Sequence, residues 1–408
     1  MKILVILPRF PYPLEKGDKL RAYHQIRVLS ENNEIYLFSL SHSKVHQEQI
    51  DCMSRYCKEI CVARISPLAS AFRVLRNLFT IKSLQIGYWD SSKARKSYRQ
   101  FESKVAPDVI YAQMIRTIKY PAHSACPKVL DYQDALSMNF ERRMTRVHGL
   151  RYFLFHYEFK MLRSAEYNAF NIFDALTIIS ERDSAAIPHR QNCDINILRN
   201  GVDFDYFSSS GHDKDVSVVF CGNMQYKPNI DAARYLVDEI MPLVWKKCPD
   251  AKVMLAGATP ASSVRQLAGP NVLVTGFVDD IRPCYDRSMV FTAPMRLGSG
   301  LQNKLLEAMA MGVPCVTTPL ANEALGATHG KELLVGDNAS ELADHIVHLL
   351  EDRQLRQDLV DNAGTFVRDN FSWEAEGRRL NEILAGAIEL HATKKEDRTV
   401  YEEELENE

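Results

Sequence analysis

The sequence predicts an α/β protein with two doubly wound, Rossmann-like domains that face a cleft. The chain has 408 residues, which is more than one hydrophobic core usually supports. Short apolar runs alternate with helical stretches, as in parallel sheets whose strands are joined by helices. The runs in the second half end near Gly or Pro. Ligands of such sheets bind beyond the carboxyl ends of the strands, so we expect the chemistry in the cleft.

The first domain is expected over residues 1–198. It opens with KILVILP, a nearly continuous apolar run followed by a Pro/Gly loop, which is typical of a buried parallel strand. An amphipathic helix is expected from about Lys19 to Ser30. The further strands of this domain are expected at residues 34–40, 59–65, 108–114, 128–134 and 175–180.

The second domain is expected over residues 199–370. A long helix is expected from about Asn229 to Cys248, and another after Gly300. Its strands are expected at residues 217–222, 251–257, 271–278, 289–294, 314–318 and 332–337. Residues 340–390 read as helical with a break around 370–373, and the mostly charged tail, residues 391–408, is expected to be disordered.

The composition is that of an ordinary globular protein, with 46% hydrophobic and 25% charged residues. No apolar stretch is long enough to span a bilayer, and the first residues lack the shape of a signal peptide. We therefore expect a cytoplasmic protein. The nine cysteines are scattered, which favours free thiols over a metal site or disulfides.

The two halves of the chain differ in charge. Residues 1–200 hold 30 Lys and Arg against 19 Asp and Glu, whereas residues 201–408 hold 20 against 33. A basic half favours an anionic partner, such as a membrane surface or a phosphate-bearing substrate, although solvated surface lysines give the same count. We expect no nucleic acid partner.

Residues 64–89 combine basic and apolar side chains in one helical stretch. Such a segment can lie in a bilayer interface, as a possible peripheral membrane contact. The alternative is a buried helix with a solvated basic edge. The basic residues of the stretch are Arg64, Arg73, Arg76 and Lys82.

The most informative motif is APMRLGSGLQNKLLEAMAMGVPCVTTP at residues 293–319. A strand runs into a glycine loop, and a helix is expected to start near Leu301 with its free N–H groups available to a phosphate. Lys304 and Arg296 add cations. Glu307 lies on the same helix face as Lys304, where a carboxylate can accept hydrogen bonds from a ribose. The alternative is a glycine turn before a core helix.

This motif resembles the nucleotide-sugar signature of the family 4 glycosyltransferases, which have the GT-B fold. Glu307 matches the second Glu of that signature, AMAMGVPCV follows it, and Ser299 stands where the family has its first Glu. The variant GSGLQNK is most similar to sugar transferases of PEP-CTERM and exopolysaccharide systems. The resemblance implies no cofactor and no required metal.

Other stretches carry the same resemblance. Residues 371–390 resemble the family's C-terminal helix, which crosses back onto the first domain. The NGVD turn at residues 200–203 resembles the family's link between domains, so Asp203 and Asp205 are not taken as metal ligands. The loop after the first strand resembles the family's acceptor and diphosphate loop, here Lys16, Gly17, Asp18 and Lys19. The implied donor-binding residues are Gly222, Asn223, Lys227, Gly276, Phe277, Val278, Ser299, Gly300, Leu301, Gln302, Asn303, Lys304 and Glu307. Two of these stretches have a simpler explanation: Lys227 as an exposed loop lysine and residues 274–281 as a plain strand end.

The catalytic groups are expected to be Asp134, Lys304 and Arg296. KVLDYQD offers Asp131 and Asp134 at a strand end with no His nearby; Asp134 can orient a hydroxyl or merely cap the next helix. The resemblance implies transfer of a sugar, with retention, from a nucleotide diphosphate sugar to a carbohydrate or lipid-linked hydroxyl acceptor. The base of the donor (UDP, GDP or ADP) is left open.

Two alternatives to a transferase remain open. Ser299 in place of Glu suggests a nucleotide-binding scaffold that has lost catalysis. A nucleotide-sugar epimerase of the same architecture would share the donor site. A dehydrogenase is disfavoured because PRFPYPLEKG, and not GxGxxG, follows the first strand.

Overall fold

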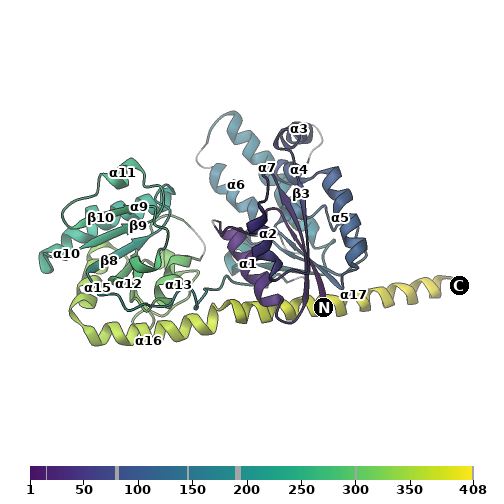
Figure 1. Cartoon of the computed structure of the whole chain (residues 1–408). Helices are drawn as coiled ribbons and strands as arrows, with labels where there is room; N and C mark the ends of the chain where they lie inside the picture. The colour runs from purple at the N-terminus through teal and green to yellow at the C-terminus, as the bar shows by residue number, and fades with distance from the viewer. Residues whose placement is uncertain (15, 79–81, 145–146, 189–193, 299–300, 407–408) are drawn as a thin grey trace. The chain divides into compact units, whose positions relative to one another are not determined.

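The computed structural model describes residues 1–14, 16–78, 82–144, 147–188, 194–298 and 301–406. They form two compact units (Figure 1). Unit 1 comprises Met1–Arg199 and Glu376–Glu408, and unit 2 comprises Asn200–Ala375. The first boundary lies one residue beyond the expected end of the first domain at 198. The return to unit 1 at Glu376 falls within residues 371–390, the segment expected to cross back.

Unit 1 contains a seven-stranded parallel sheet in the order β3-β2-β1-β4-β5-β6-β7. From β1 the chain first adds β2 and β3 on one side, and then crosses back to add β4 to β7 on the other side of β1. This is the doubly wound arrangement. Each expected strand is present, and β7 is an addition of two residues. The strands are β1 (Lys2–Leu7), β2 (Glu34–Ser41), β3 (Glu59–Arg64), β4 (Val109–Gln113), β5 (Lys128–Asp131), β6 (Ala175–Ile178) and β7 (Asn196–Ile197).

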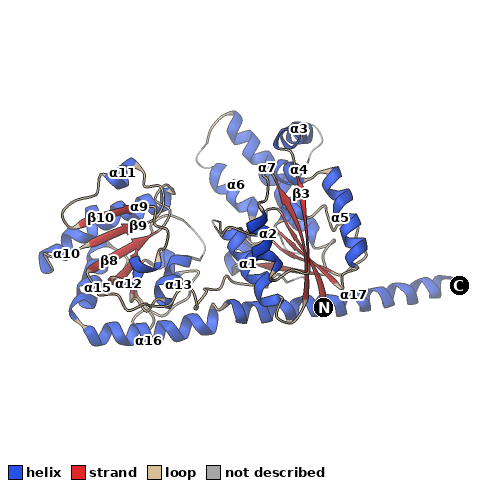
Figure 2. Cartoon of the chain, viewed as in Figure 1, coloured by secondary structure: helices blue, strands red, loops and turns tan. Residues whose placement is uncertain are grey.

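Helices cover both faces of this sheet (Figure 2) because its strands are apolar on both sides. Ile3 and Val5 of β1 pack on the face covered by α1, α2 and α17. Leu4 and Ile6 pack on the opposite face, against α4 to α7. The helices of unit 1 are α1 (Gly17–Leu29), α2 (Gln47–Ser54), α3 (Pro67–Leu78), α4 (Leu84–Trp89), α5 (Ser92–Val105), η1 (Ile115–Thr117), α6 (Leu136–Met144), α7 (Leu150–Ala169) and α8 (Glu181–Ala186).

Unit 2 contains a six-stranded parallel sheet in the order β10-β9-β8-β11-β12-β13, around a single hydrophobic core. The order reverses between β8 and β11, as it does between β1 and β4 in unit 1. All six expected strands are present: β8 (Val216–Cys221), β9 (Val253–Ala256), β10 (Val272–Gly276), β11 (Ser288–Ala293), β12 (Cys315–Thr317) and β13 (Leu334–Val335). Short helices of this unit are α11 (Ser262–Arg265), α12 (Arg282–Asp286), α13 (Asn303–Ala310) and α14 (Pro319–Asn322).

The helix expected from Asn229 to Cys248 is one helical stretch in three parts. These are α9 (Lys227–Tyr235), a π-turn η2 (Leu236–Ile240) and α10 (Met241–Lys247). Pro242 lies in the first turn of α10. Because proline has no N–H to donate to the preceding turn, the regular hydrogen-bond ladder is interrupted there.

The C-terminal region forms α15 (Ala339–Glu351), α16 (Arg353–Asn370) and α17 (Trp373–Glu406), with the expected break after Asn370. Leu380, Leu384 and Ala387 of α17 are buried against the core of unit 1. The tail that we expected to be disordered is helical through Glu406. Its Glu, Lys and Arg residues are good helix formers, and the packed first half of α17 supplies the nucleus that a short charged helix lacks.

Candidate functional site

The residues of the expected phosphate site meet where the strand order of unit 2 reverses. Gly222 directly follows β8, and the loop after β11 leads into α13. At this position the carboxyl ends of neighbouring strands leave room for a ligand. The C-terminal unit therefore has its candidate site where open α/β sheets bind theirs.

Lys304 is the central cation of this site. Its Nζ donates to Oδ1 of Asn229 over 2.6 Å and lies 4.8 Å from the centre of the Phe220 ring. Burial lowers the pKa of Lys304 to about 8, although the nearby Glu307 acts to raise it. The ammonium group is therefore poorly solvated. An anion bound next to it would stabilise its charge in place of the missing water.

Asn229 is itself fixed in place. Its Nδ2 donates to the carbonyl of Asn223 over 3.0 Å, which leaves Oδ1 for Lys304. A Cβ at position 222 would lie 2.7 Å from this Nδ2 and 3.4 Å from Nζ of Lys304. Gly222 is thus required by the packing of both side chains, and it leaves the backbone open to a close approach.

Glu307 lies one turn further along α13. Its Oε2 accepts a hydrogen bond of 2.7 Å from the hydroxyl of the buried Tyr285. Burial raises the pKa of Glu307, while the Tyr285 hydrogen bond and the charge of Lys304 act to lower it. The Tyr285 bond orients the carboxylate, which suits a group that accepts hydrogen bonds from hydroxyls.

The start of α13 agrees with the expectation of a helix beginning near Leu301. The helix begins at Asn303, with Gln302 as its N-cap. Leu301 packs against the core of unit 2. Ser299 and Gly300 lie outside the described residues. Lys304 is consequently the second residue of α13, in the first turn, where helix N–H groups attract anions.

Arg296 has other partners than the ones we expected. Its guanidinium pairs with Asp231 at 3.1 Å and with Glu239 at 3.2 Å, and it lies 3.9 Å from the centre of the Tyr235 ring. Two carboxylates already balance its charge. The structure therefore ties Arg296 to α9 and η2, and its expected contact with a phosphate stays a prediction.

Lys227 and Asn223 stand on either side of the turn that leads into α9. Lys227 is exposed and is the first residue of that helix. Oδ1 of Asn223 accepts from the backbone of Gln225 over 3.0 Å. Asn223 thus shapes the turn, and Lys227 stays an exposed lysine whose contact with a ligand is a prediction.

The loop after β10 presents an aromatic side chain. Gly276 has a φ of +74°, which allows the chain to turn sharply there. Phe277 is 73% exposed and Val278 is half-buried. An apolar ring at the carboxyl edge of the sheet is a surface on which a nucleobase can stack, and this loop was expected to bind the donor.

In unit 1, the two strand-end aspartates differ in role. Asp131 is fully buried and accepts from Nε of Arg21 over 2.7 Å, so it belongs to the core. Asp134 is half-buried and accepts from Nδ2 of Asn139 over 2.7 Å. Burial raises the pKa of Asp134. The sequence predicted both aspartates at the strand end, but only Asp134 is accessible enough to contact a ligand.

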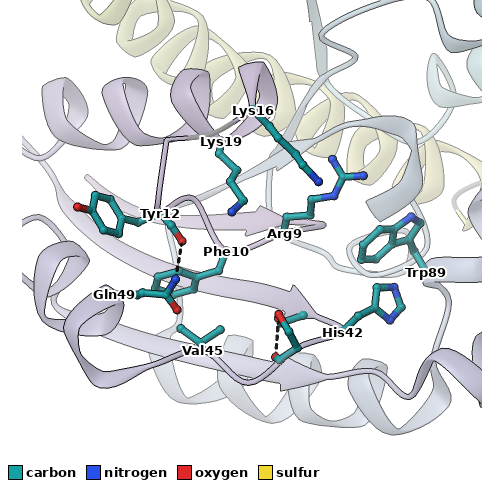
Figure 3. Close-up of a pocket in the computed structure, with 11 residues that line it drawn as sticks. Arg9, Phe10, Tyr12, Lys16, Lys19, His42, Val45, Gln49 and Trp89 are labelled. Carbon is teal, nitrogen blue, oxygen red and sulfur yellow. Dashed lines mark hydrogen bonds between the residues drawn. The ribbon is translucent and has the colours of Figure 1, made fainter. Parts of the chain in front are cut away.

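The loop residues Lys16, Gly17, Asp18 and Lys19 lie at the start of α1, with Lys16 as its N-cap. Lys16 and Lys19 line a pocket of unit 1, whereas Asp18 pairs with Arg9 at 2.7 Å. Arg9 and His42 also line this pocket, and the sequence reasoning missed them. His42 directly follows β2, and Arg9 lies two residues after β1 (Figure 3); these positions at the carboxyl ends of buried strands could have revealed them.

Two possible features are absent from the residues that the structure describes. No group of three or more His, Cys, Asp or Glu is placed to hold a metal ion among them. Within the same residues, no helix combines the length and apolar character needed to cross a bilayer.

Residues 215–352 match the family described as glycosyl transferases group 1. An uncharacterized 44.6 kDa protein in the cps region of Klebsiella pneumoniae is 22% identical over 391 residues, covering 91% of this chain and 96% of its own. A GDP-mannose-dependent monoacylated alpha-(1-6)-phosphatidylinositol monomannoside mannosyltransferase of Corynebacterium glutamicum is 29% identical over 210 residues. That match covers 46% of this chain and 55% of the mannosyltransferase.

Solved structures share the fold at low sequence identity. HepE of Anabaena in complex with UDP has a TM-score of 0.67 at 14% identity, with 95% of this chain and 100% of HepE covered. Sucrose-phosphate synthase of Thermosynechococcus elongatus has a TM-score of 0.64 at 13% identity, with 94% and 98% covered. The fold is GT-B, as the sequence predicted, and the chain is a transferase.

Proposed function

With a glycosyl transferases group 1 domain in unit 2 as the premise, we propose that the chain transfers a sugar from a nucleotide diphosphate sugar to a hydroxyl acceptor. The observation that carries the proposal is the setting of Lys304. Its ammonium group is half-buried, held by Asn229 and placed in the first turn of α13. This arrangement suits a diphosphate.

The leaving diphosphate gains negative charge as the bond to the sugar breaks. A preorganised cation and helix N–H groups stabilise such charge most strongly where water is scarce. Lys304 and the first turn of α13 supply both. Lys227 is a second, exposed cation for the same group, and Arg296 is not assigned to it because Asp231 and Glu239 already pair with it.

The nucleoside is bound by the next elements of the same sheet edge. We assign the ribose hydroxyls to Glu307, oriented by Tyr285, and the base to the loop at Gly276, Phe277 and Val278. HepE has been solved with UDP and with UDP-glucose, so UDP-glucose is the first donor to test. The GDP-mannose dependence of the corynebacterial relative makes GDP-mannose the second.

Retention of configuration and independence of a metal follow from the resemblance to family 4 glycosyltransferases. In that mechanism the donor phosphate takes the proton of the acceptor, so the enzyme needs no separate base. Asp134 is the candidate for orienting the acceptor hydroxyl or the sugar. Its carboxylate is half-buried and fixed by Asn139.

The acceptor is proposed to be a surface polysaccharide or glycolipid, presented at the inner face of a membrane. The named relatives support this choice: one protein belongs to a cps region, and the other acts on a phosphatidylinositol mannoside. The cytoplasmic location expected from the sequence agrees with such an acceptor.

Helix α3 supports peripheral membrane contact. We expected either an interfacial helix or a buried one, and three of its apolar side chains are exposed: Leu68 by 84%, Phe72 by 71% and Leu75 by 57%. Arg64 before the helix, Arg76 in it and Lys82 after it are exposed as well. An apolar ridge with basic neighbours suits an anionic bilayer surface.

The membrane contact is tested by co-sedimentation with vesicles that contain 30% phosphatidylserine. We expect wild-type protein to pellet and the variant Phe72→Ser with Leu75→Ser to stay in solution. The matched control is Leu273→Ser, which alters an exposed leucine of unit 2. Equal pelleting of all three proteins removes this part of the proposal.

The transfer itself is tested by incubating the purified full chain with UDP-, GDP- and ADP-sugars, with and without EDTA. We expect one nucleotide diphosphate to be released, EDTA to have no effect, and the product to keep the anomeric configuration of the donor in NMR spectra. An altered sugar still attached to its nucleotide would instead identify an epimerase, and binding without turnover a scaffold.

A further inference from the structure

Arg116 lies just beyond the end of β4, at the carboxyl edge of the unit 1 sheet, and the proposed function gives it no role. In the neighbouring strand β5, Asp131 stands opposite Gln113 of β4. Arg116 follows Gln113 by three positions, and Asp134 follows Asp131 by three. Arg116 and Asp134 therefore leave the sheet at equivalent places, where open α/β sheets bind ligands.

The backbone next to both residues is strained. Met114 and Gln133 have φ angles of +63° and +65°, values that residues other than glycine rarely adopt. Asp131 holds both of them: its carbonyl oxygen accepts from the N–H of Met114 over 2.7 Å, and its Oδ1 accepts from the N–H of Gln133 over 3.0 Å. Strain that is held in place by a buried residue is common at binding and catalytic sites.

The guanidinium group of Arg116 has no carboxylate partner among the residues that the structure describes. Its Nη1 donates to the sulfur of Met114 over 3.9 Å, which is a weak acceptor, and its Nε is buried without a partner. Nη2 makes no hydrogen bond there either, but it is not one of the buried atoms, so this end can meet a ligand. Unused donors on a half-buried cation are costly unless a ligand accepts from them.

Charges of both signs surround Arg116. Burial lowers its pKa, and the positive charges of Arg9 and Arg143 add to this effect, while the negative charges of Asp134 and Asp18 act to raise it. Asp18 already pairs with Arg9 at 2.7 Å. Asp134 is therefore the carboxylate near Arg116 that has no cationic partner within the described residues.

Asp134 keeps an oxygen available in the same way. Its Oδ2 accepts from Asn139 over 2.7 Å, and its Oδ1 accepts from no other residue that the structure describes. Burial raises the pKa of Asp134, the charge of Asp183 adds to this effect, and Asn139 and Arg116 act to lower it. The charge of Asp134 in turn contributes to the raised pKa of Glu166. No ion pair joins Asp134 to Arg116, both of which are described, so donor and acceptor stay available to a third group.

A hydroxyl group suits this pair better than an ion does. Asp134 would repel an anion, and Arg116 would repel a cation. A hydroxyl group accepts from a guanidinium and donates to a carboxylate at the same time, and both hydrogen bonds are charge-assisted. A site that binds a hydroxyl in this way rejects an analogue that lacks it.

Resting on the proposed function, we infer that Arg116 and Asp134 together bind a hydroxyl group of the acceptor sugar other than the one that reacts. Arg116 donates to the oxygen of this hydroxyl, and Asp134 accepts its hydrogen bond. The reacting hydroxyl stays free to give its proton to the donor phosphate. Arg116 is thus a specificity-determining residue, because it selects the acceptor sugar by the presence and orientation of one hydroxyl.

Ligand-observed NMR titration of the full chain tests the inference, with the methyl glycosides of glucose, galactose and mannose as probes. We expect the wild type to bind at least one of them, and Arg116→Met to bind it about tenfold more weakly, the effect of one charge-assisted hydrogen bond. The matched control, Arg99→Met, removes an exposed arginine of α5 and should bind as the wild type does. Binding of none of the three probes, or equal binding by Arg116→Met and the wild type, would overturn the inference.

Monodeoxy derivatives of the bound glycoside locate the hydroxyl. One derivative should lose about as much affinity for the wild type as the parent sugar loses for Arg116→Met. For that derivative the Arg116→Met change should cause no further loss, because the partner of Arg116 is already gone. Losses that add for every derivative would place Arg116 away from the sugar and contradict the inference.

Opposite shifts with pH test the role of Asp134. Its carboxyl group accepts in this way only when ionised, so affinity should fall as the pH falls through its pKa. Arg116→Met removes a charge that lowers this pKa, so the fall should begin at a higher pH than in the wild type. Asp183→Asn removes a charge that raises it, so the fall should begin at a lower pH. Both shifts should persist in a Glu166→Gln background, and shifts in one direction would count against the pair.

Thermal unfolding without ligand distinguishes a structural role. Arg116 has no charged partner to lose, so Arg116→Met should unfold at the midpoint of the wild type or above it. Arg21→Met should unfold at a lower temperature, because it leaves Asp131 buried without its cation. A comparable loss of stability in both variants would identify Arg116 as a structural residue and overturn the inference.

The titrations contain no donor, so they are independent of turnover. If no donor releases its nucleotide diphosphate, the proposed function fails, and the Arg116 variants still decide whether the hydroxyl is bound. If a donor is turned over while Arg116→Met binds the glycosides as the wild type does, the proposed function stands and this inference is overturned.

Discussion

Nζ of Lys304 lies 2.6 Å from Oδ1 of Asn229, two residues that are 75 positions apart in the sequence. The contact joins α13 to α9 across the point where the strand order of unit 2 reverses. It fixes a poorly solvated ammonium group next to Gly222. The pH dependence of nucleotide binding and the effect of Gly222→Ala follow from this contact.

Nucleotide diphosphate binding should depend on the charge of Lys304. Its pKa is lowered to about 8, so the group is charged at pH 7 and loses its proton as the pH rises through 8. The Kd measured by calorimetry should therefore rise as the pH is raised from 7 to above 8. In Lys304→Arg the side chain stays charged, and the rise should disappear. An unchanged pH profile in that variant would show that another group controls binding.

Gly222→Ala should impair the donor site without unfolding unit 2. The added Cβ would displace Asn229 Nδ2, 2.7 Å away, and with it the partner of Lys304. We expect turnover to fall about tenfold, comparable to the loss of one charge-assisted hydrogen bond. Gly364→Ala in α16 is the control, because nothing lies within 4 Å of its Cβ. Equal activity of the two variants would show that the donor site does not depend on the packing of Asn229 against Gly222.

Tyr285→Phe should weaken nucleotide binding through Glu307. The variant removes the 2.7 Å hydrogen bond that orients the carboxylate and acts to lower its pKa. The Kd should increase by about threefold to tenfold, more at pH 6 than at pH 8, because the carboxylate then protonates more readily. The Glu307→Gln variant should bind the nucleotide at least as weakly as Tyr285→Phe at both pH values. A Tyr285→Phe variant with the Kd of the wild type would indicate that Glu307 does not contact the ribose.

Glu166 should make the stability of unit 1 depend on pH. Its side chain is fully buried, and Oε1 accepts a hydrogen bond from the backbone N–H of Ser137. Burial raises the pKa of Glu166 to about 7. Between pH 4.5 and 7 the unfolded chain releases this proton while the folded chain keeps it, so stability falls as the pH rises. Glu166→Gln should therefore gain stability at pH 8 relative to wild type, by up to about 3 kcal/mol, and gain much less at pH 5.

Thermal unfolding at the two pH values measures this difference. The control is Glu48→Gln, which alters an exposed residue of α2 and should shift neither midpoint. If Glu166→Gln changed the midpoint by the same amount at pH 5 and pH 8, the carboxyl group would not have the raised pKa.

The sequence was sufficient for those features that depend on local pattern. The strands of both sheets appear where apolar runs predict them, because buried parallel strands are continuous in apolar residues. Lys304 and Glu307 were identified together, since their spacing on one helix fixes their relative position.

Features that depend on distant partners were not predictable in this way. The pairing of Arg296 with Asp231 and Glu239 depends on how α9 and η2 pack, and no local pattern reports it. The partner of Lys304, Asn229, lies on another helix. The helical tail could not be predicted from composition, which favours disorder in so charged a segment. Its helix continues from the part of α17 that packs on unit 1, and this packing depends on distant residues.

The central claim, that Lys304 holds the diphosphate of the donor, is tested most directly by the affinity of Lys304→Met for UDP or for whichever nucleotide diphosphate the donor screen selects. Loss of a charge-assisted contact should raise the Kd about tenfold to hundredfold at pH 7. The control Lys246→Met, an exposed lysine of α10, should match the wild type. A folded Lys304→Met protein that binds the nucleotide as tightly as the wild type would contradict the account.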